Sequence, residues 1–263
     1  MDPTCAIRVH CVDGEKPREL IGEAPVSVVV QERPYATLLA TPGEADALAA
    51  GFCLSEGLIA DPADLASIHV DGSRARVSLA SRRLETVGHR LADRRMPDAP
   101  DLDLRDVPPA TKGPVFDPAA VRAKIESLDT LQPLRRRTRA AHCAALYDKD
   151  LQLLSVAEDV GRHNALDKAV GKLLLGGGFH RICLLVLSSR ISFEMVNKAA
   201  RARVAVVAAV SRPTSLAVSL ARRLGMTLVT PDGPGGLCVY CGPGRLEGFA
   251  KEGGMDVHSS AGD

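Results

Sequence analysis

The sequence predicts an α/β protein, and three observations predict it. After residue 150, four short apolar runs alternate with three segments of helical length and periodicity. Such runs are typical of a largely parallel sheet that is covered on both faces and joined by right-handed crossovers. Before residue 90, two pairs of apolar runs flank one helical segment, which predicts a second, smaller α/β unit. Aromatic residues make up only 3% of the chain, so both cores must be aliphatic.

The length of 263 residues is enough for two domains that each bury a core. We expect a small α/β N-terminal domain over residues 1–90 and a larger α/β domain over residues 117–263. Between them, residues 91–116 are rich in proline and alternate Asp with Arg without a clear period, which predicts a linker or a long loop.

In the N-terminal part, the runs 24–31 and 35–40 predict a hairpin with its turn at Gln31 to Pro34. The next segment predicts a helix that is capped by Thr41, has Pro42 at its first position and closes near Gly57. The run 68–79 predicts a second hairpin, since an Asp-Gly pair at residues 71 and 72 interrupts alternating polarity.

In the C-terminal part, Asp117 followed by Pro118 predicts the start of an amphipathic helix. Beyond it we expect strands and helices in alternation. The strand candidates are 151–157, 181–188, 204–210 and 226–230, and the helix candidates are 164–175, 192–202 and 213–225.

Charge and cysteine content restrict the class of function. The net charge is only +1, so no overall field favours nucleic acid or an anionic membrane, and charge recognition must be local. No apolar run approaches the roughly 18 to 20 residues of a membrane span, and the polar N-terminus lacks the core of a signal peptide. We therefore expect a cytoplasmic protein whose seven cysteines are reduced thiols.

The three strand-to-helix junctions of the C-terminal part carry the strongest chemical signal. They read EDVGRHN, SSRIS and SRPTS, and each contains an arginine: Arg162, Arg190 and Arg212. In a parallel sheet these junctions lie at one edge, where helix N-termini favour anions. Arginine pairs with phosphate oxygens in a bidentate manner, so a phosphate-rich ligand is expected. The further candidates for binding are His163, Asn164, Lys168, Ser189, Ser192, Ser211, Thr214 and Ser215.

Plainer roles compete with ligand binding at these positions. The hydroxyl residues are also common helix caps, and the charges around Arg162 could form a solvated helix face. Glu194 near a helix start could compensate a helix dipole or act in acid-base chemistry.

Two further places carry reactive side chains. His142 and Cys143 stand side by side in an apolar segment, where the histidine could be either a core residue or a catalytic one. Cys238 and Cys241 have the C-x-x-C spacing, yet a continuous strand would send their side chains to opposite faces. No second cysteine or histidine pair accompanies them, so we expect uncommitted thiols and no metal site.

With these residues in view, the chain resembles the formate dehydrogenase accessory family, FdhD/NarQ, over most of its length. The motifs that carry the resemblance are EAPVSVVV, TPGEADALAAGFCLSEGLI, HCAALY, EDVGRHNALDKAVG, LLVLSSRISFEMVNKAARA and VAAVSRPTSLAVSLARRLGMTLV. The resemblance implies a cytidine-deaminase-like fold for the C-terminal α/β domain. It also implies a sulfurtransferase that takes sulfur as a persulfide from a cysteine desulfurase.

The acceptor implied by the resemblance is the molybdenum bis-guanylyl-pterin cofactor, before its insertion into the formate dehydrogenase apo-enzyme. A guanosine diphosphate-like moiety suits the edge with three arginines. The family's cofactor-contacting segment corresponds to Pro231, Asp232, Gly233, Pro234, Gly235 and Gly236. We also expect a homodimer.

The chain departs from the family pattern at three places. The family's sulfur-carrying cysteines lie in a C-G-x-C-G loop, and the matching residues 88–102 contain no cysteine. Arg139 and Ala140 replace a glycine pair before His142, and the segment 231–236 contains no arginine.

Three functions follow as alternatives. In the first, a relocated thiol carries sulfur, either Cys143 beside His142 or the pair Cys238 and Cys241. In the second, the protein binds the cofactor as a chaperone or divergent paralogue without sulfur transfer. A zinc-dependent deaminase is disfavoured, because no H-x-E motif with a downstream P-C-x-x-C is present.

Overall fold

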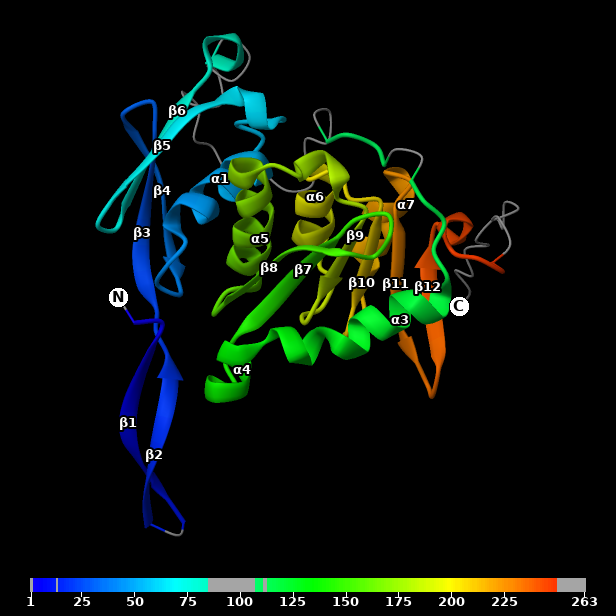
Figure 1. Ribbon diagram of the computed structural model, residues 1–263, viewed down its shortest axis with the longest axis horizontal. Helices are drawn as coiled ribbons and strands as arrows, with labels where there is room; N and C mark the ends of the chain where they lie inside the picture. Colours follow the sequence, from blue (N-terminus) through cyan, green and yellow to red (C-terminus); the bar gives the residue numbers. More distant parts are fainter. Residues whose placement is uncertain (1, 13, 85–106, 111–112, 250–263) are drawn as a thin grey trace, which may run out of the picture.

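The computed structural model describes residues 2–12, 14–84, 107–110 and 113–249, and its centre is a six-stranded sheet (Figure 1). The strand order is β12-β11-β10-β9-β7-β8. The strands are β7 (His142–Tyr147), β8 (Leu153–Asp159), β9 (Leu184–Leu187), β10 (Val206–Ala209), β11 (Thr227–Asp232) and β12 (Gly236–Cys241). The α/β fold class and the alternation of strands and helices are thus confirmed.

Four of the six strands run in one direction. β9, β10 and β11 pair in parallel, whereas β7 lies antiparallel to both β8 and β9, so β8 points the same way as β9. β12 is antiparallel to β11 and forms the far edge. Because β8, β9, β10 and β11 share a direction, their carboxyl ends meet at one edge of the sheet, as the sequence predicted.

Helices cover both faces of this sheet. On one face lie α5 (Arg162–Gly176), α6 (Phe193–Arg201) and α7 (Ser215–Arg223), which follow β8, β9 and β10. α3 (Pro118–Glu126) packs on the opposite face through Val121 and Ile125, and α4 (Pro133–Thr138) follows it (Figure 1). The Asp117 carboxylate accepts a hydrogen bond from the Ala119 N–H at 2.9 Å, which confirms the predicted cap of α3.

The N-terminal part forms a four-stranded sheet, a helix and a ribbon. The sheet has the order β4-β3-β6-β5, with β3 (Ala24–Val30), β4 (Arg33–Ala40), β5 (Leu65–Asp71) and β6 (Arg74–Leu79). Both predicted hairpins are present as β3-β4 and β5-β6. The ribbon of β1 (Thr4–Cys11) and β2 (Gly14–Ile21) extends away from the rest of the chain (Figure 1), and Arg137 of α4 pairs with Glu19 at its base.

The predicted cap of the first helix is wrong. α1 (Ala45–Ser55) begins three residues later than expected, after Glu44, which has a φ of 59°. Thr41 instead bonds residues of the C-terminal part, since its hydroxyl accepts from the Val160 N–H at 3.0 Å. A long-range contact has therefore taken the side chain that the local pattern assigned to the helix.

α1 packs against α5 at an unusually close approach. A Cβ atom added at Gly51 would lie 1.9 Å from the carbonyl oxygen of Asp167, and one added at Gly171 would lie 1.8 Å from that of Ala47. Only glycine allows two helix backbones to meet at this distance. Buried side chains of both parts accordingly form one continuous hydrophobic cluster, which includes Val28, Leu48, Leu166 and Leu187.

The division into two domains at residues 90 and 117 stays a prediction. Most of the proline-rich segment lies outside the described residues. Of the described helices, none combines the length and the apolar composition that crossing a bilayer requires.

Candidate functional site

The predicted binding residues line up along one edge of the large sheet. In strand order, this edge carries the segment after β8 with Arg162, the start of β7 at His142, and the segment after β9 with Arg190. It continues with the segment after β10, which holds Arg212, and ends at the turn between β11 and β12, residues 232–236. We call this row the carboxyl edge.

At the first junction, a buried ion pair organises the motif EDVGRHNALDK. The Lys168 Nζ lies 2.7 Å from the Asp159 carboxylate, and the two side chains are 2% and 0% exposed. Lys168 also donates to the carbonyl oxygen of Thr41 at 2.7 Å, while the Thr41 N–H donates to Asp159 at 3.0 Å. This network therefore fastens the end of β4 to the start of α5.

Asn164 belongs to the same network. Its amide donates to the carbonyl oxygen of Leu39 at 2.7 Å and to Asp159 at 3.1 Å. Asn164 and Lys168 are thus occupied by protein partners, and their predicted contact with a ligand stays a prediction. The exposed part of the carboxyl edge lies elsewhere.

Two polar groups at this end of β7 and β8 lack hydrogen-bond partners among the described residues. Among the described residues, neither the buried Nδ1 of His142 nor the buried Nε of Arg162 has a hydrogen-bond partner. Burial, together with the nearby Arg135 and Arg162, lowers the pKa of His142, so its ring is neutral at pH 7. A neutral imidazole beside two guanidinium groups can donate one hydrogen bond to an anionic ligand through its ring N–H.

The second and third junctions are held against each other. A parallel bridge joins Ile191 to Pro213, and the Thr214 N–H donates to the carbonyl oxygen of Ile191 at 3.0 Å. Arg190 and Arg212 directly precede these two bridge residues, and both are exposed. Within the described part of the chain neither guanidinium forms an ion pair or a hydrogen bond, so both are open to a ligand.

The hydroxyl groups at these junctions divide into two kinds. Thr214 caps α7 by accepting from the Ala217 N–H at 3.2 Å, so its plainer role is observed. Ser189 is buried and donates to the carbonyl oxygen of Arg190. Ser192 stands at the N-cap of α6 without making a capping bond, and its buried Oγ has no partner among the described residues.

The predicted cofactor segment 231–236 forms the tip of the hairpin between β11 and β12. Asp232 pairs with Gly236, and the intervening Gly233 and Gly235 have φ values of 51° and 79°, which favour glycine. Asp232 and the three residues after it are exposed. The tip therefore extends the carboxyl edge with backbone groups and one carboxylate.

The buried thiol of Cys143 is unsuited to carrying a persulfide. Cys143 is 1% exposed, and burial raises its pKa to about 12, with a further contribution from Glu158. The nucleophilic form of cysteine is the thiolate, which such a pKa disfavours at neutral pH. Of the two relocated-thiol candidates, the pair of Cys143 and His142 is the less suitable.

Cys238 and Cys241 lie on the same face of β12, contrary to the expectation of opposite faces. Cys238 is opposite Thr230 and Cys241 is opposite Leu228, because the register shifts by one residue within β12. Paired residues share a face, and the two partners are two positions apart on β11. Neither thiol forms a disulfide; the buried Cys241 thiol donates to the Met226 carbonyl oxygen at 3.4 Å, whereas Cys238 is half-buried.

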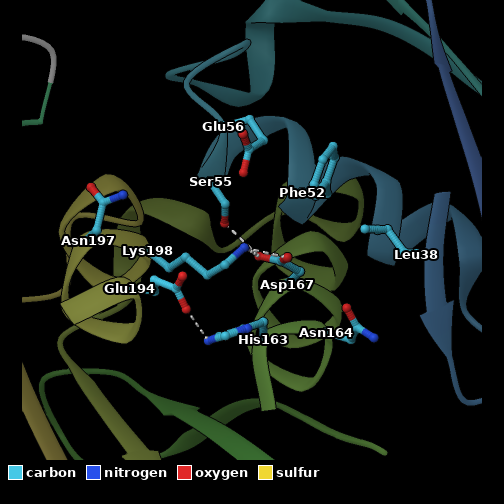
Figure 2. Close-up of a pocket in the computed structure, with 10 residues that line it drawn as sticks. All are labelled: Leu38, Phe52, Ser55, Glu56, His163, Asn164, Asp167, Glu194, Asn197 and Lys198. Carbon is cyan, nitrogen blue, oxygen red and sulfur yellow. Dashed lines mark hydrogen bonds and ion pairs between the residues drawn. The ribbon is translucent and has the colours of Figure 1, made fainter. Parts of the chain in front are cut away.

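A cavity of about 270 Å³ adjoins the carboxyl edge between α1, α5 and α6 (Figure 2). At its centre the Asp167 carboxylate accepts from the Ser55 hydroxyl at 2.5 Å and from Lys198 Nζ at 2.6 Å. At the starts of α5 and α6, His163 Nε2 lies 2.9 Å from a carboxylate oxygen of Glu194. Figure 2 shows these two linked groups side by side within one hollow.

Charged groups of both signs surround the cavity. Burial lowers the pKa of His163 despite the opposing effect of Glu194, so the histidine adds little positive charge at pH 7. Burial raises the pKa of Glu56, and Asp167 raises it further, whereas Lys198 lowers it. The raised pKa favours the neutral form of Glu56, and the positive charges of Arg162 and Arg201 act on the cavity together with Lys198.

Sequence patterns alone missed this cavity and the Lys168 network. Ser55 and Lys198 occupy ordinary positions of amphipathic helices, and the fold alone brings both of them to Asp167. The small residues of GEADALAAGF were a usable signal, because a glycine within a helix indicates close packing. Among the described residues, no group of three or more His, Cys, Asp or Glu side chains could hold a metal ion.

Comparison with known proteins gives concordant results. A family model described as the FdhD/NarQ family matches residues 21–247. The sulfur carrier protein FdhD of Streptomyces coelicolor is 37% identical over 256 residues, covering 88% of this chain and 90% of that protein. The protein of the same name from Chromobacterium violaceum is 38% identical over 223 residues, covering 79% and 83%.

A solved structure has the same fold. The crystal structure of a candidate formate dehydrogenase accessory protein from Desulfotalea psychrophila aligns with a TM-score of 0.75 at 25% sequence identity. The alignment covers 92% of this chain and 98% of that one.

Proposed function

The chain belongs to the FdhD/NarQ family, and from this premise we propose that it binds the molybdenum bis-guanylyl-pterin cofactor as cargo for formate dehydrogenase. The carboxyl edge is the proposed binding surface. The proposed partners are a cysteine desulfurase, the formate dehydrogenase apo-enzyme and a second copy of the chain, in the cytoplasm.

The observation that carries this proposal is the set of uncommitted donors along one edge. Arg190 and Arg212 are exposed and form no ion pair or hydrogen bond within the described part of the chain. His142, Arg162 and Ser192 each keep a buried polar atom without a partner among the described residues. Buried polar groups are normally satisfied, so unpaired donors in a row favour a ligand with many acceptors. The diphosphates of a guanylyl-pterin supply such acceptors.

Nucleotide titration tests the binding surface. We expect guanosine diphosphate to bind the wild-type protein, and Arg190→Ala and Arg212→Ala each to weaken binding by about 1 to 3 kcal/mol. The matched control is Arg223→Ala, because Arg223 is an exposed arginine at the opposite end of α7 from Arg212. Equal affinities in all four proteins would contradict the proposed surface.

Sulfur transfer forms the second part of the proposal, and Cys238 is its carrier. Cys238 is half-buried on the outermost strand, two residues from the tip segment of the carboxyl edge. In the proposed step, its thiolate takes the terminal sulfur of a desulfurase persulfide. A new persulfide forms on Cys238, and the desulfurase cysteine leaves as a thiolate.

Cofactor binding without sulfur transfer is the competing function. It is favoured by the absence of cysteine from residues 54–142 and by the burial of Cys143 and Cys241. Incubation with a cysteine desulfurase and cysteine, followed by mass spectrometry, separates the two. We expect a persulfide that Cys238→Ser removes and Cys143→Ala keeps, whereas no labelled cysteine would leave the chaperone function.

A further inference from the structure

The ribbon of β1 and β2 lacks the packing that a two-stranded ribbon needs for its stability. It forms a sheet of its own, without a third strand among the described residues, and it extends away from the rest of the chain (Figure 1). Of its described side chains, only Thr4 is buried. An isolated two-stranded ribbon is at best marginally stable in water, so we expect a further strand to pair with it.

The hydrogen-bond ladder of the ribbon determines which backbone groups point outward. The Gly22 N–H donates to the carbonyl oxygen of Pro3 at 2.6 Å, and bonded pairs alternate with non-bonded pairs along an antiparallel ladder. By the register of the ribbon, the pair of Arg8 with Pro17 is therefore non-bonded, and so is the pair that contains Ala6. Residues of non-bonded pairs direct their N–H and C=O groups to the two outer edges of the ribbon.

The two outer edges differ in what they offer to another strand. On β2, Pro17 has no N–H and blocks the middle of the edge. On β1, the Thr4 N–H donates to the Asp2 carboxylate at 2.9 Å, whereas the N–H groups of Ala6 and Arg8 donate to no other described residue. The edge of β1 is therefore the open one.

One face of β1 is apolar. Cys5, Ile7 and Val9 occupy alternate positions, and alternate residues of a strand share a face. Leu20 lies opposite Cys5 on β2 and extends the same face. Ile7 and Leu20 are each 41% exposed. The edge of β1 thus combines outward backbone groups with an apolar row against which the side chains of another strand can pack.

We infer that β1 pairs with β1 of a second copy of the chain, so that the two ribbons form one four-stranded sheet across a two-fold axis. An antiparallel pairing centred on Ile7 places Ile7 opposite its own counterpart and Cys5 opposite Val9 of the second copy. In this register the outward groups of Ala6 and Arg8 form hydrogen-bonded pairs, and apolar side chains face each other. The pattern fits its own two-fold image, which favours a second copy as the partner.

Charge and shape agree with this pairing. The side chain of Arg8 lies opposite Ala6 of the second copy, so no like charge faces it directly, and its guanidinium is 3.9 Å from Glu15 of its own β2. α4 lies beside β2, and among the described elements only β2 packs closely on β1 (Figure 1). A second copy is one of the partners proposed above, whereas the pairing of β1 goes beyond cofactor binding.

Sedimentation equilibrium of the full chain tests the interface. We expect the wild-type protein to dimerise and Arg8→Pro to raise the dissociation constant at least about tenfold, because it removes two interchain hydrogen bonds and spares the ladder of the ribbon. The matched control is Arg8→Ala, which loses the same side chain, keeps the N–H and should dimerise as the wild type does. A monomeric wild type, or equal dissociation constants for the two variants, would overturn the inference.

Oxidative cross-linking locates the pairing without a change at Arg8. In a Cys5→Ser, Cys11→Ser background, Ile7→Cys places one thiol on each side of the two-fold axis, where the Cα atoms of a non-bonded pair are about 4.5 Å apart and within reach of a disulfide. The matched control is Arg18→Cys, because Arg18 is exposed, lies directly opposite Ile7 and shares its face. Across the axis the two copies of Arg18 are three strand spacings apart, about 14 Å, which is too far for a disulfide.

The pattern of cross-links decides between edge pairing and other contacts. We expect a covalent dimer from Ile7→Cys and none from Arg18→Cys, with peptide mapping to identify the joined residues. Cross-linking of both variants would indicate ribbons stacked face to face, and cross-linking of neither would indicate a different interface. Any pattern other than the expected one overturns the inference. Neither measurement involves a nucleotide, so its failure leaves the proposed cofactor surface untouched.

Discussion

The ammonium group of Lys168 lies 2.7 Å from the carboxylate of Asp159, and both side chains are almost completely buried. The pair joins two segments that are far apart in sequence, because both groups also bond Thr41. The most charged motif of the chain therefore holds the N-terminal part on the C-terminal sheet.

Removal of the lysine should destabilise the protein strongly. Lys168→Met leaves the Asp159 charge buried without its ionic partner, and we expect a loss of about 3 kcal/mol in the free energy of unfolding. The N–H groups of Thr41 and Gly161 still reach Asp159 and keep the loss at the lower end of the usual range. Urea unfolding measures it.

An exposed pair provides the control for this variant. Lys149 and Asp150 also lie 2.7 Å apart, yet their side chains are 70% and 63% exposed. Lys149→Met should change stability by less than about 1 kcal/mol. Equal losses in the two variants would show that burial does not determine the contribution of the pair.

The close packing of α1 against α5 depends on two glycines. Gly51→Ala or Gly171→Ala places a methyl group within 2 Å of a carbonyl oxygen, so the helices must separate. We expect a loss of about 2 to 3 kcal/mol in unfolding free energy, which exceeds the gain of about 1 kcal/mol in helix propensity. Gly176→Ala, with no atom within 4 Å of the added carbon, should lie within about 1 kcal/mol of the wild type.

Alkaline pH should weaken the fold through two buried thiols. Burial raises the pKa of both Cys53 and Cys143 to about 12, from the ordinary value of 9.0. Above pH 9 the unfolded chain releases these protons while the folded chain retains them, so stability falls as pH rises towards 12. Unfolding free energies measured at several pH values should fall more gently in the Cys53→Ala, Cys143→Ala double variant. Parallel curves would contradict the burial of these groups.

The ring of His142 should titrate below the ordinary value of 6.5. Burial is the first cause of its lowered pKa, followed by the positive charges of Arg135 and Arg162. Because the unfolded chain then binds the proton first, this histidine destabilises the fold as pH decreases below 6.5. Proton-carbon NMR should show that Arg162→Ala raises the pKa of His142, whereas Arg223→Ala leaves it unchanged.

Local sequence signals predicted most of the elements, and where they failed the cause was a partner on another segment of the chain. Asp117 caps α3 as expected, because a side chain that bonds a neighbouring N–H needs no tertiary partner. The same type of signal predicted that Thr41 caps α1, and this prediction was wrong, since the Val160 N–H and the Asp159 carboxylate bind the polar groups of Thr41 instead. The prediction that Cys238 and Cys241 lie on opposite faces was wrong, because the register shift of β12 against β11 cannot be recognised from the sequence of β12 alone.

The candidate site was predictable as a row of residues but not as a set of contacts. Strand direction follows from the alternation of strands and helices, so the junctions with Arg162, Arg190 and Arg212 could be assigned to one edge. His142 joins that edge because β7 inserts between β8 and β9, which no pattern indicated. The cavity requires three helices at once, and it was missed.

By itself, the sequence determined the family, the α/β class and the edge on which the arginines lie, because these depend on period, order and motif along the chain. Tertiary structure alone decided that Lys168 is buried with Asp159, that the Cys143 thiol is inaccessible, and that Ser55, Asp167 and Lys198 share one cavity. These outcomes depend on burial and on partners that are distant in sequence, and no local pattern specifies either.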